Sequence, residues 1–287
     1  MDDWEPLKLA KESKTFCVMP WIHQFTNQVS KVKLCCLDSD KPIGDLSKNT
    51  LKELWNSENI KQIRLDMLSG KKIVNCKWCD DRDSTTYSFK HYQNNLFLDN
   101  TEIQNVINST EKDGSLQNHK LFYLDIRLNN LCNLSCRTCS EISSSVWAIE
   151  NGREDFLFYP GKHNGDYYNQ IIEHIDNVKS IYFAGGEPLI QKEHYELLEE
   201  LISRNRTECP LRYNTNLTKL VYNKKNVLDY WSKFKKIWVM VSVDGNHSNL
   251  EYWRNGTNYG ILLKNLDRKS TRLNSSHMSE SRMPSSA

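Results

Sequence analysis

The chain has 287 residues, with 38 basic and 36 acidic side chains and a net charge of +2. So small a net charge supplies no overall field that would recruit nucleic acid or an anionic membrane. The longest apolar run, 237–243, is too short to span a bilayer, and residues 1–14 contain no secretory pattern. We therefore expect a cytoplasmic protein without nucleic-acid or membrane partners, whose nine cysteines are metal ligands or free thiols rather than disulfides.

The first region, residues 1–92, contains five of the cysteines. An alternating segment at 29–37 predicts a hairpin strand that ends in Cys35-Cys36, and apolar residues at helical spacing predict a helix from 51 to the stop at Gly70. Adjacent residues of a strand point to opposite faces, so we expect only one of the two adjacent cysteines to be a metal ligand and favour Cys35.

Three more cysteines complete this module, Cys17 before the strand and the Cys76-x2-Cys79 pair after the helix. Four thiols from Cys17, Cys35, Cys76 and Cys79 can bind either a structural zinc ion or an iron-sulfur cluster. The residues themselves leave both alternatives open.

Residues 93–119 are polar and rich in asparagine, with a helix predicted at 101–109 and a turn at Asp113-Gly114. We interpret this segment as a linker without chemistry of its own.

The second region, residues 120–268, alternates predicted strands with helices, which is typical of parallel βα units. The strands are predicted at 121–128, 178–184, 211–215 and 236–243. The fold class predicted for the chain is therefore α/β, a partial TIM-type (β/α) barrel preceded by a small cysteine-rich α+β module. In such sheets ligands bind at the carboxyl ends of the strands.

A cysteine loop, Leu131 to Ser140, follows the first of these strands. Its thiols, Cys132, Cys136 and Cys139, have the spacing Cys-x3-Cys-x2-Cys. Iron-sulfur cubanes normally take four protein ligands, so three thiolates leave one iron open to a substrate or cofactor. A zinc knuckle would need a fourth Cys or His close by.

At these residues the chain resembles the radical S-adenosylmethionine (SAM) superfamily, and a second motif, Gly185-Gly186-Glu187-Pro188, stands after the next strand as the family's Gly-Gly-Glu-Pro element does. The resemblance implies that Cys132, Cys136 and Cys139 hold a [4Fe-4S] cluster whose fourth iron is chelated by SAM. Two glycines let the backbone carbonyls approach the methionine ammonium, Glu187 adds a carboxylate, and Pro188 starts a helix.

Polar residues at the ends of the later strands are further candidates for cofactor binding. Asn216 follows the third strand, and Ser242 and Asp244 end the fourth, where the family has an element that contacts the ribose. Arg254 is a candidate for the SAM carboxylate. For each residue the alternative is a polar side chain satisfied within the fold.

The order of cysteines in residues 1–92 resembles the auxiliary-cluster module called twitch or SPASM, which in the well-known members follows the barrel instead of preceding it. The resemblance implies a second [4Fe-4S] cluster on the N-terminal cysteines. The tail, residues 269–287, is rich in serine and without periodicity, and is interpreted as a non-native disordered segment, so that the natural protein is expected to continue beyond the sequence shown.

Together these resemblances imply a radical SAM oxidoreductase of the maturase type. Such an enzyme reductively cleaves SAM to a 5′-deoxyadenosyl radical that abstracts hydrogen from a substrate. They also imply a flavodoxin- or ferredoxin-type reductant and a substrate that is a peptide or protein, with a small molecule as the second choice. The alternative from a different class is a non-catalytic scaffold that binds zinc or iron-sulfur.

Overall fold

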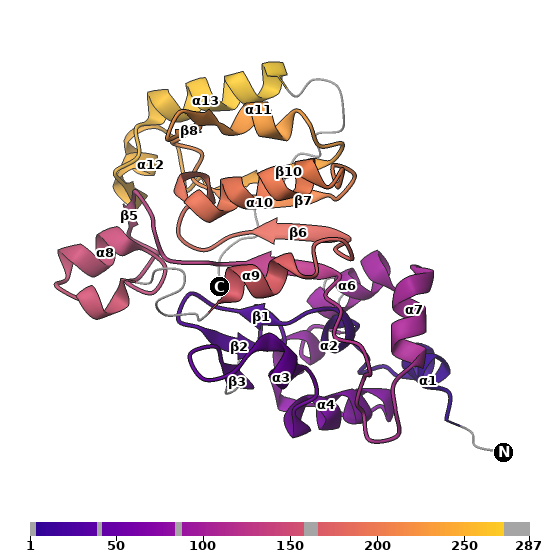
Figure 1. Ribbon diagram of the computed structural model, residues 1–287. Helices are drawn as coiled ribbons and strands as arrows, with labels where there is room; N and C mark the ends of the chain where they lie inside the picture. Colours follow the sequence, from indigo (N-terminus) through magenta and orange to yellow (C-terminus); the bar gives the residue numbers. More distant parts are fainter. Residues whose placement is uncertain (1–3, 39–41, 84–87, 158–165, 273–287) are drawn as a thin grey trace. The chain divides into compact units, whose positions relative to one another are not determined.

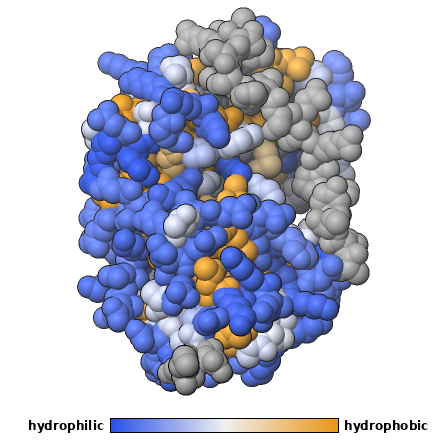
Figure 2. All heavy atoms as spheres, turned by 90° about the vertical axis from the view of Figure 1, so that its right-hand side faces the viewer, coloured by the Kyte–Doolittle hydropathy of each residue, from blue (hydrophilic) through white to orange (hydrophobic). Residues whose placement is uncertain are grey.

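The computed structural model describes residues 4–38, 42–83, 88–157 and 166–272. The chain divides into two compact units, Met1–Leu124 and Asp125–Ala287 (Figure 1). The face drawn in Figure 2 is mostly hydrophilic, with apolar residues in small groups, as expected when the large apolar side chains are in the cores. Within the described part of the chain, no helix combines the length and the apolar character needed to cross a membrane.

The first unit consists of short helices around a small sheet. Its elements in the described ranges are α1 (Pro6–Glu12), α2 (Met19–Ile22), β1 (Phe25–Thr26), β2 (Lys31–Lys33), β3 (Gly44–Asp45), α3 (Leu51–Trp55), α4 (Glu58–Leu68), the 3-10 helix η1 (Val74–Cys76), α5 (Lys77–Asp80), α6 (Phe89–Phe97) and α7 (Thr101–Asn108). The strands pair antiparallel in the order β1-β2-β3.

Two elements of this unit differ from the sequence prediction. The strand ends at Lys33, before the cysteine pair, because the chain turns there and the amide of Asp38 donates to the carbonyl of Cys35 at 3.2 Å. The helix predicted from 51 to Gly70 is two helices that break at Asn56, whose side chain instead hydrogen-bonds both the amide and the carbonyl of Leu116. A tertiary contact thus overrides the helical pattern.

The fully buried Arg64 holds the centre of the first unit together. Its guanidinium donates to the carbonyls of Pro20, Trp55 and Gly114 and to the side chain of Asn56, at 3.0 to 3.2 Å. It also lies over the ring of Trp55 at 4.8 Å. Since no carboxylate is among these partners, burial lowers the pKa of Arg64 to about 9.

The second unit is an α/β layer structure. Its elements, of which β4 crosses the unit boundary, are β4 (Tyr123–Ile126), β5 (Ser135–Cys136), α8 (Ser145–Glu150), the 3-10 helix η2 (Glu154–Phe156), α9 (Tyr167–Ile172), β6 (Ser180–Phe183), the 3-10 helix η3 (Pro188–Ile190), α10 (Lys192–Ser203), β7 (Leu211–Thr215), β8 (Val221–Tyr222), β9 (Lys225–Asn226), α11 (Val227–Trp231), β10 (Ile237–Val241), α12 (His247–Trp253), β11 (Arg254–Asn255) and α13 (Tyr259–Arg272).

The main sheet of this unit has the strand order β10-β7-β6-β4, and β7 runs parallel to both β6 and β10. Phe183 and Tyr213 are register partners on neighbouring strands, and their rings stack at 4.8 Å in the core. Helices α10, α11 and α13 lie alongside these strands (Figure 1). The predicted α/β class with a partial parallel sheet is confirmed, and the sheet formed by the described strands is open.

The C-terminal helix α13 continues to Arg272, four residues past the predicted end of the barrel region at 268. The remainder of the predicted tail, residues 273–287, lies outside the described residues.

Candidate functional site

The cysteine loop of the second unit lies between β4 and α8 and is fixed by a short ladder. Within it β5 pairs antiparallel with β11, so that Cys136 lies opposite Arg254. The amide of Arg137 extends the contact by donating to the carbonyl of Trp253 at 2.8 Å. The loop is thereby attached to a segment more than a hundred residues later in the chain.

The N-terminus of α8 fixes the other side of the loop, through residues that the sequence analysis did not single out. Ser145 Oγ accepts from the amide of Cys132 and donates to its carbonyl, both at 3.2 Å. Ser144 Oγ donates to the carbonyl of Leu134 at 2.7 Å, and Trp147 Nε1 donates to the carbonyl of Cys136 at 2.8 Å. A run of serines after a metal-binding loop is a helix N-cap signal, and could have identified this support.

The Gly-Gly-Glu-Pro element lies directly against the cysteine loop. Gly186 has φ +53°, and a Cβ on it would come within 2.4 Å of the Leu131 carbonyl oxygen, so only glycine fits. The amide of Glu187 donates to the same carbonyl at 2.7 Å. Gly185 also has a positive φ, and its carbonyl accepts from Gln191 Nε2 at 3.2 Å. The two motifs recognised in the sequence are therefore in contact.

The carboxylate of Glu187 is buried and is already engaged within the fold. It accepts from Thr215 Oγ1 at 2.6 Å, from the amide of Asn216 at 2.7 Å and from the amide of Leu189 at 3.1 Å. Burial raises the pKa of Glu187 to about 7, against the opposing effect of these hydrogen bonds. Pro188 begins η3, as expected of a first-turn proline. Glu187 thus joins the ends of β6 and β7, and its contact with SAM stays a prediction.

Asn216 connects the end of β7 to the cysteine loop. Its Nδ2 donates to Asn133 Oδ1 at 3.1 Å, and Asn133 Nδ2 donates to Thr218 Oγ1 at 2.9 Å. Thr218 Oγ1 in turn donates to Asn216 Oδ1 at 2.7 Å, which closes a ring of three side chains. Asn133 and Thr218 were missed by the sequence analysis, because their role depends on two loops meeting.

The remaining predicted contacts lie at the end of β10 and around β11. The amide of Ser242 donates to the carbonyl of Thr215 at 2.9 Å, and its side chain is half-buried. Asp244 is exposed and forms an ion pair with Arg254 at 2.8 Å. Arg254 Nη1 also donates to Cys136 Sγ at 3.8 Å. The structure therefore places Arg254 beside a cluster-loop thiol, while its predicted contact with the SAM carboxylate stays untested.

None of the three loop thiols forms a disulfide, and burial acts on all three. Burial raises the pKa of Cys132 to about 12, with smaller upward contributions from Glu187 and the two other loop thiols. Burial also raises the pKa of Cys136 and Cys139, and the positive charge of Arg254 opposes this in both. A metal centre that binds here would displace the thiol protons and be coordinated by the resulting thiolates.

The four thiols predicted as ligands in the first unit also form one group. Burial raises the pKa of Cys35, and among the smaller contributions are those of Cys17 and Cys76. Burial raises the pKa of Cys76 in the same way, with contributions from Cys17 and Cys79. Three segments of the chain, one of which carries both Cys76 and Cys79, thus bring these thiols near one another.

A buried polar contact joins two of these segments. Asn75 Nδ2 donates to both carboxylate oxygens of Asp38 at 3.1 Å, and the Asp38 carboxylate also accepts from the amide of Leu34 at 3.1 Å. The turn that carries Cys35 is thereby attached to the residue before Cys76. Because the cysteine pair lies in this turn, the alternating-face argument that only one of the two is a ligand does not apply, and the preference for Cys35 stays a prediction.

Both thiol sets have the donor chemistry of iron-sulfur sites. Among the described residues, no three Cys, His, Asp or Glu side chains converge as a site for a single metal ion. A four-iron cubane binds each thiolate at a different iron, so its ligands surround the cluster rather than one point. That the three thiols of the second unit hold an open-coordinated cluster, and the four of the first unit a fully coordinated one, stays a prediction.

Comparison with protein families gives two matches along the chain. The model of the radical SAM superfamily matches residues 126–271. The model of the SPASM family, described as an iron-sulfur cluster-binding domain, matches residues 17–80. These families imply SAM and two iron-sulfur centres, in agreement with the predicted cofactors.

Individual proteins are similar over part of their length. An uncharacterized protein of Methanocaldococcus jannaschii is 28% identical over 138 residues, which are 47% of this chain and 43% of that protein. The crystal structure of Streptococcus suis SuiB has 17% identity, a TM-score of 0.40 and coverage of 75% of this chain and 46% of its own. SuiB bound to SAM has 15% identity, a TM-score of 0.36 and coverage of 75% and 47%. The chain spans less than half the length of these proteins.

Proposed function

Because the chain belongs to the radical SAM superfamily, we propose that it is the cluster-binding part of an enzyme that cleaves SAM reductively and removes a hydrogen atom from its substrate. We propose a peptide or protein as the substrate and a small molecule as the second choice, with a cytoplasmic flavodoxin- or ferredoxin-type protein as the reductant. The peptide class is proposed because the N-terminal region matches a SPASM domain. In the family that the sequence resembles, auxiliary clusters of this kind usually serve substrate binding or electron transfer during the modification of peptides and proteins.

The observation that carries the proposal is the contact between the two motifs. Gly186 lies on the backbone of Leu131, the residue before the first loop cysteine, and Arg254 lies on the thiol of Cys136. Three free thiols are held together in one loop, and no fourth cysteine belongs to that loop. This arrangement supports a cluster with one iron left for SAM.

The residues of the chain then have distinct parts in the reaction. A [4Fe-4S] cluster bound there would supply the electron for reductive cleavage of SAM, and hydrogen abstraction from the substrate would follow. Cys132, Cys136 and Cys139 anchor the cluster, and Glu187 holds the ends of β6 and β7 beside it. The positive charge of Arg254 favours the thiolate form of Cys136.

We propose that Cys17, Cys35, Cys76 and Cys79 hold the auxiliary cluster. Their four thiols would occupy all four irons, so this site would serve electron transfer or substrate binding rather than SAM cleavage. The match of the SPASM family over residues 17–80 includes all four.

The experiment that tests this function is metal analysis of the full chain after anaerobic reconstitution. Iron, sulfide and zinc are measured per chain for the wild type, for a variant with Cys132, Cys136 and Cys139 changed to Ala, and for Cys209→Ala. Cys209 is a buried thiol beside Pro210 at the start of β7, outside both sites, so its variant is the matched control. The formation of 5′-deoxyadenosine under dithionite is measured in the same samples.

We expect about eight irons per wild-type chain and about four in the triple variant, since each cubane contains four. Only the wild type and Cys209→Ala should form 5′-deoxyadenosine. If the triple variant contains zinc instead of iron, the N-terminal thiols form a structural zinc site and not an auxiliary cluster. A wild type that binds no iron, or that binds it without any SAM cleavage, would contradict the enzyme proposal and favour a scaffold.

A further inference from the structure

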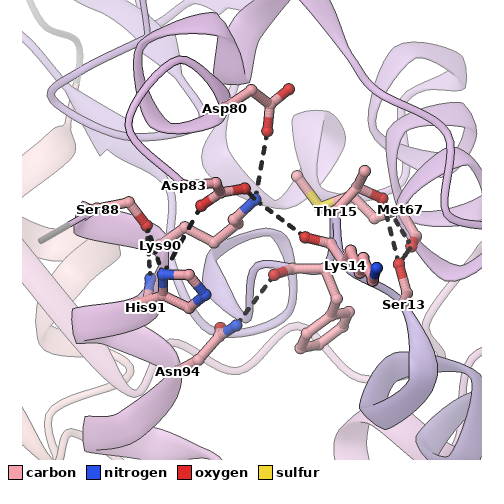
Figure 3. Close-up of polar contacts among 11 residues, drawn as sticks. Ser13, Lys14, Thr15, Met67, Asp80, Asp83, Ser88, Lys90, His91 and Asn94 are labelled. Atoms are coloured by element: carbon pink, nitrogen blue, oxygen red, sulfur yellow. Dashed lines mark hydrogen bonds and ion pairs between the residues drawn. The ribbon is translucent and has the colours of Figure 1, made fainter. Parts of the chain in front are cut away.

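A buried lysine lies at the edge of the N-terminal thiol group. The side chain of Lys90, on α6, is 1% exposed. Its Nζ donates to the carbonyl of Lys14 at 3.1 Å and to the carboxylates of Asp83 at 2.5 Å and Asp80 at 3.3 Å. Figure 3 shows the ammonium between these three acceptors. Burial opposes the charge, but the two carboxylates raise the pKa of Lys90, so that it stays protonated.

One helical turn later, Asn94 holds the segment that carries Cys17. Its Nδ2 donates to the carbonyl of Phe16 at 3.0 Å, which Figure 3 also shows, and its Oδ1 accepts from the amide of Val18 at 2.9 Å. A single side chain thereby fixes the backbone on both sides of Cys17. Residues four apart on a helix share a face, so Lys90 and Asn94 act from the same side of α6.

This face of α6 also contacts the segment that carries Cys76 and Cys79. The ammonium of Lys90 pairs at 3.3 Å with Asp80, the residue after Cys79, and donates at 3.1 Å to the carbonyl of Lys14, three residues before Cys17. Lys90 thus bonds to two of the segments that carry the thiols, although it lies ten residues beyond the end of the matched domain at 80. In agreement with this position, its positive charge lowers the pKa of Cys17, Cys76 and Cys79, in each case against the larger effect of burial.

We propose that the Lys90–Asn94 face of α6 is part of the auxiliary cluster site, in which Asn94 positions Cys17 and the buried ammonium of Lys90 sets the reduction potential. The proposal rests on the proposed function, because it takes the N-terminal thiols to hold a [4Fe-4S] cluster. It makes Lys90 a positioning and charge-balancing residue and not a ligand.

The expected effect follows from charge. A cubane with four thiolate ligands is an anion, and reduction adds one more negative charge. The ammonium of Lys90 favours the reduced form, whereas the carboxylates of Asp80 and Asp83 disfavour it. Removal of the ammonium alone therefore leaves two carboxylates without their cation beside the cluster and makes reduction harder. Removal of one carboxylate has the opposite effect and makes reduction of the cluster easier.

The test measures the midpoint potential of the auxiliary cluster by redox titration followed by electron paramagnetic resonance. Full-length chains carry the change of Cys132, Cys136 and Cys139 to Ala, so that only the auxiliary cluster gives a signal. The variants on this background are Lys90→Met, Lys90→Arg and Asp83→Asn. Lys61→Met is the matched control, because Lys61 also pairs with two carboxylates, those of Glu58 and Asp113, but has no described interaction with a thiol.

We expect a lower potential in Lys90→Met, a higher one in Asp83→Asn, and an unchanged one in Lys90→Arg and Lys61→Met. If Lys90→Met takes up no iron, a higher potential in Asp83→Asn together with an unchanged potential in Lys90→Arg still supports the inference. Iron uptake with the same potential in all variants would overturn it and leave the proposed function intact. A parent chain without iron in the first unit would instead overturn the proposed function.

Discussion

The two thiol sites are built in opposite ways. The three cysteines of the second unit lie within eight residues, and the β5–β11 ladder and side chains at the start of α8 fix their loop. The four proposed ligands of the first unit come from three segments, because Cys76 and Cys79 share one, and side chains such as Asn75, Asn94 and Lys90 bond to those segments. The site in the second unit needs only one loop to be held in place, whereas the dispersed site depends on polar side chains that join its segments.

Each site also has one associated cation, and the two differ in burial. Arg254 is 17% exposed and pairs with the exposed Asp244, while Lys90 is 1% exposed and lies between two carboxylates. Charge interactions are stronger where water is excluded. We therefore expect electrostatic changes to matter more in the first unit and steric changes to matter more in the second.

The largest expected effect is steric, in Gly186→Ala. A Cβ within 2.4 Å of the Leu131 carbonyl must displace the cysteine loop, in addition to roughly 1–2 kcal/mol for a left-handed alanine. Iron per chain should fall from about eight to about four, with the loss confined to the SAM cluster. Gly152→Ala is the control, because Gly152 has φ +62° but nothing within 4 Å of its Cβ position. Equal iron in both variants would show that the contact does not hold the loop.

The next effect tests the dispersed site through Asn75→Ala. The change removes the donor to both oxygens of the buried Asp38 carboxylate, at a cost of about 1–3 kcal/mol. Iron in the first unit should be lost while SAM cleavage by the second unit is retained. Asn151→Ala, which removes an exposed amide that donates to Glu141, should leave both unchanged. Retention of all iron by Asn75→Ala would refute the role of this contact.

A smaller effect is expected from Arg254→Gln, which removes the guanidinium from Cys136 and Asp244. Changes in groups that support metal ligands typically cost about 10–100-fold in metal affinity or activity, so 5′-deoxyadenosine should form more slowly by that factor. Arg153→Gln is the matched control, because Arg153 forms an exposed ion pair with Asp155 in the same unit. Full activity of Arg254→Gln would show that the guanidinium is not needed and that the β5–β11 ladder and Trp147 hold Cys136.

The smallest effect concerns pH and stability. Burial lowers the pKa of His194 to about 3, so below pH 6.5 the unfolded chain binds a proton that the folded second unit does not. The contribution of His194 to stability is thus complete above pH 6.5 and falls as the pH drops toward 3, by about 1.4 kcal/mol per pH unit. Glu187 of the same unit has the opposite sign, because burial raises its pKa to about 7 and the folded unit therefore binds a proton there before the unfolded chain does. The buried Arg64 of the first unit stays charged in this range.

Hydrogen exchange measured at pH 6.5 and 5 tests this difference. Amides of β6 and β7 should change little in protection between these pH values in the wild type, because His194 and Glu187 act with opposite signs, after correction for intrinsic rates. In His194→Gln they should gain protection at pH 5, because glutamine does not titrate and no longer offsets Glu187, and its amide can still bond to the Tyr213 hydroxyl. An equal pH dependence in wild type and variant would assign the effect to other groups.

The sequence by itself determined what is local. The spacing of Cys132, Cys136 and Cys139, the Gly-Gly-Glu-Pro element and the alternation of strands and helices were all readable, because each depends on a few consecutive residues. The α/β class followed from the alternation, the cofactors were implied by the family resemblance of the two motifs, and both are confirmed. The contact of Gly186 with the loop was foreseen only as a meeting of two motifs at the same end of the sheet.

The tertiary structure alone decided what depends on distant residues. The helix broke at Asn56 because its side chain bonds to Leu116, and β2 ended before Cys35 because the chain turns at Asp38. Glu187 used its carboxylate to join two strand ends, and Lys90 and Asn94 emerged as neighbours of the N-terminal thiols. No local pattern encodes these contacts, since hydrogen bonds between remote segments form only when packing brings both partners out of water.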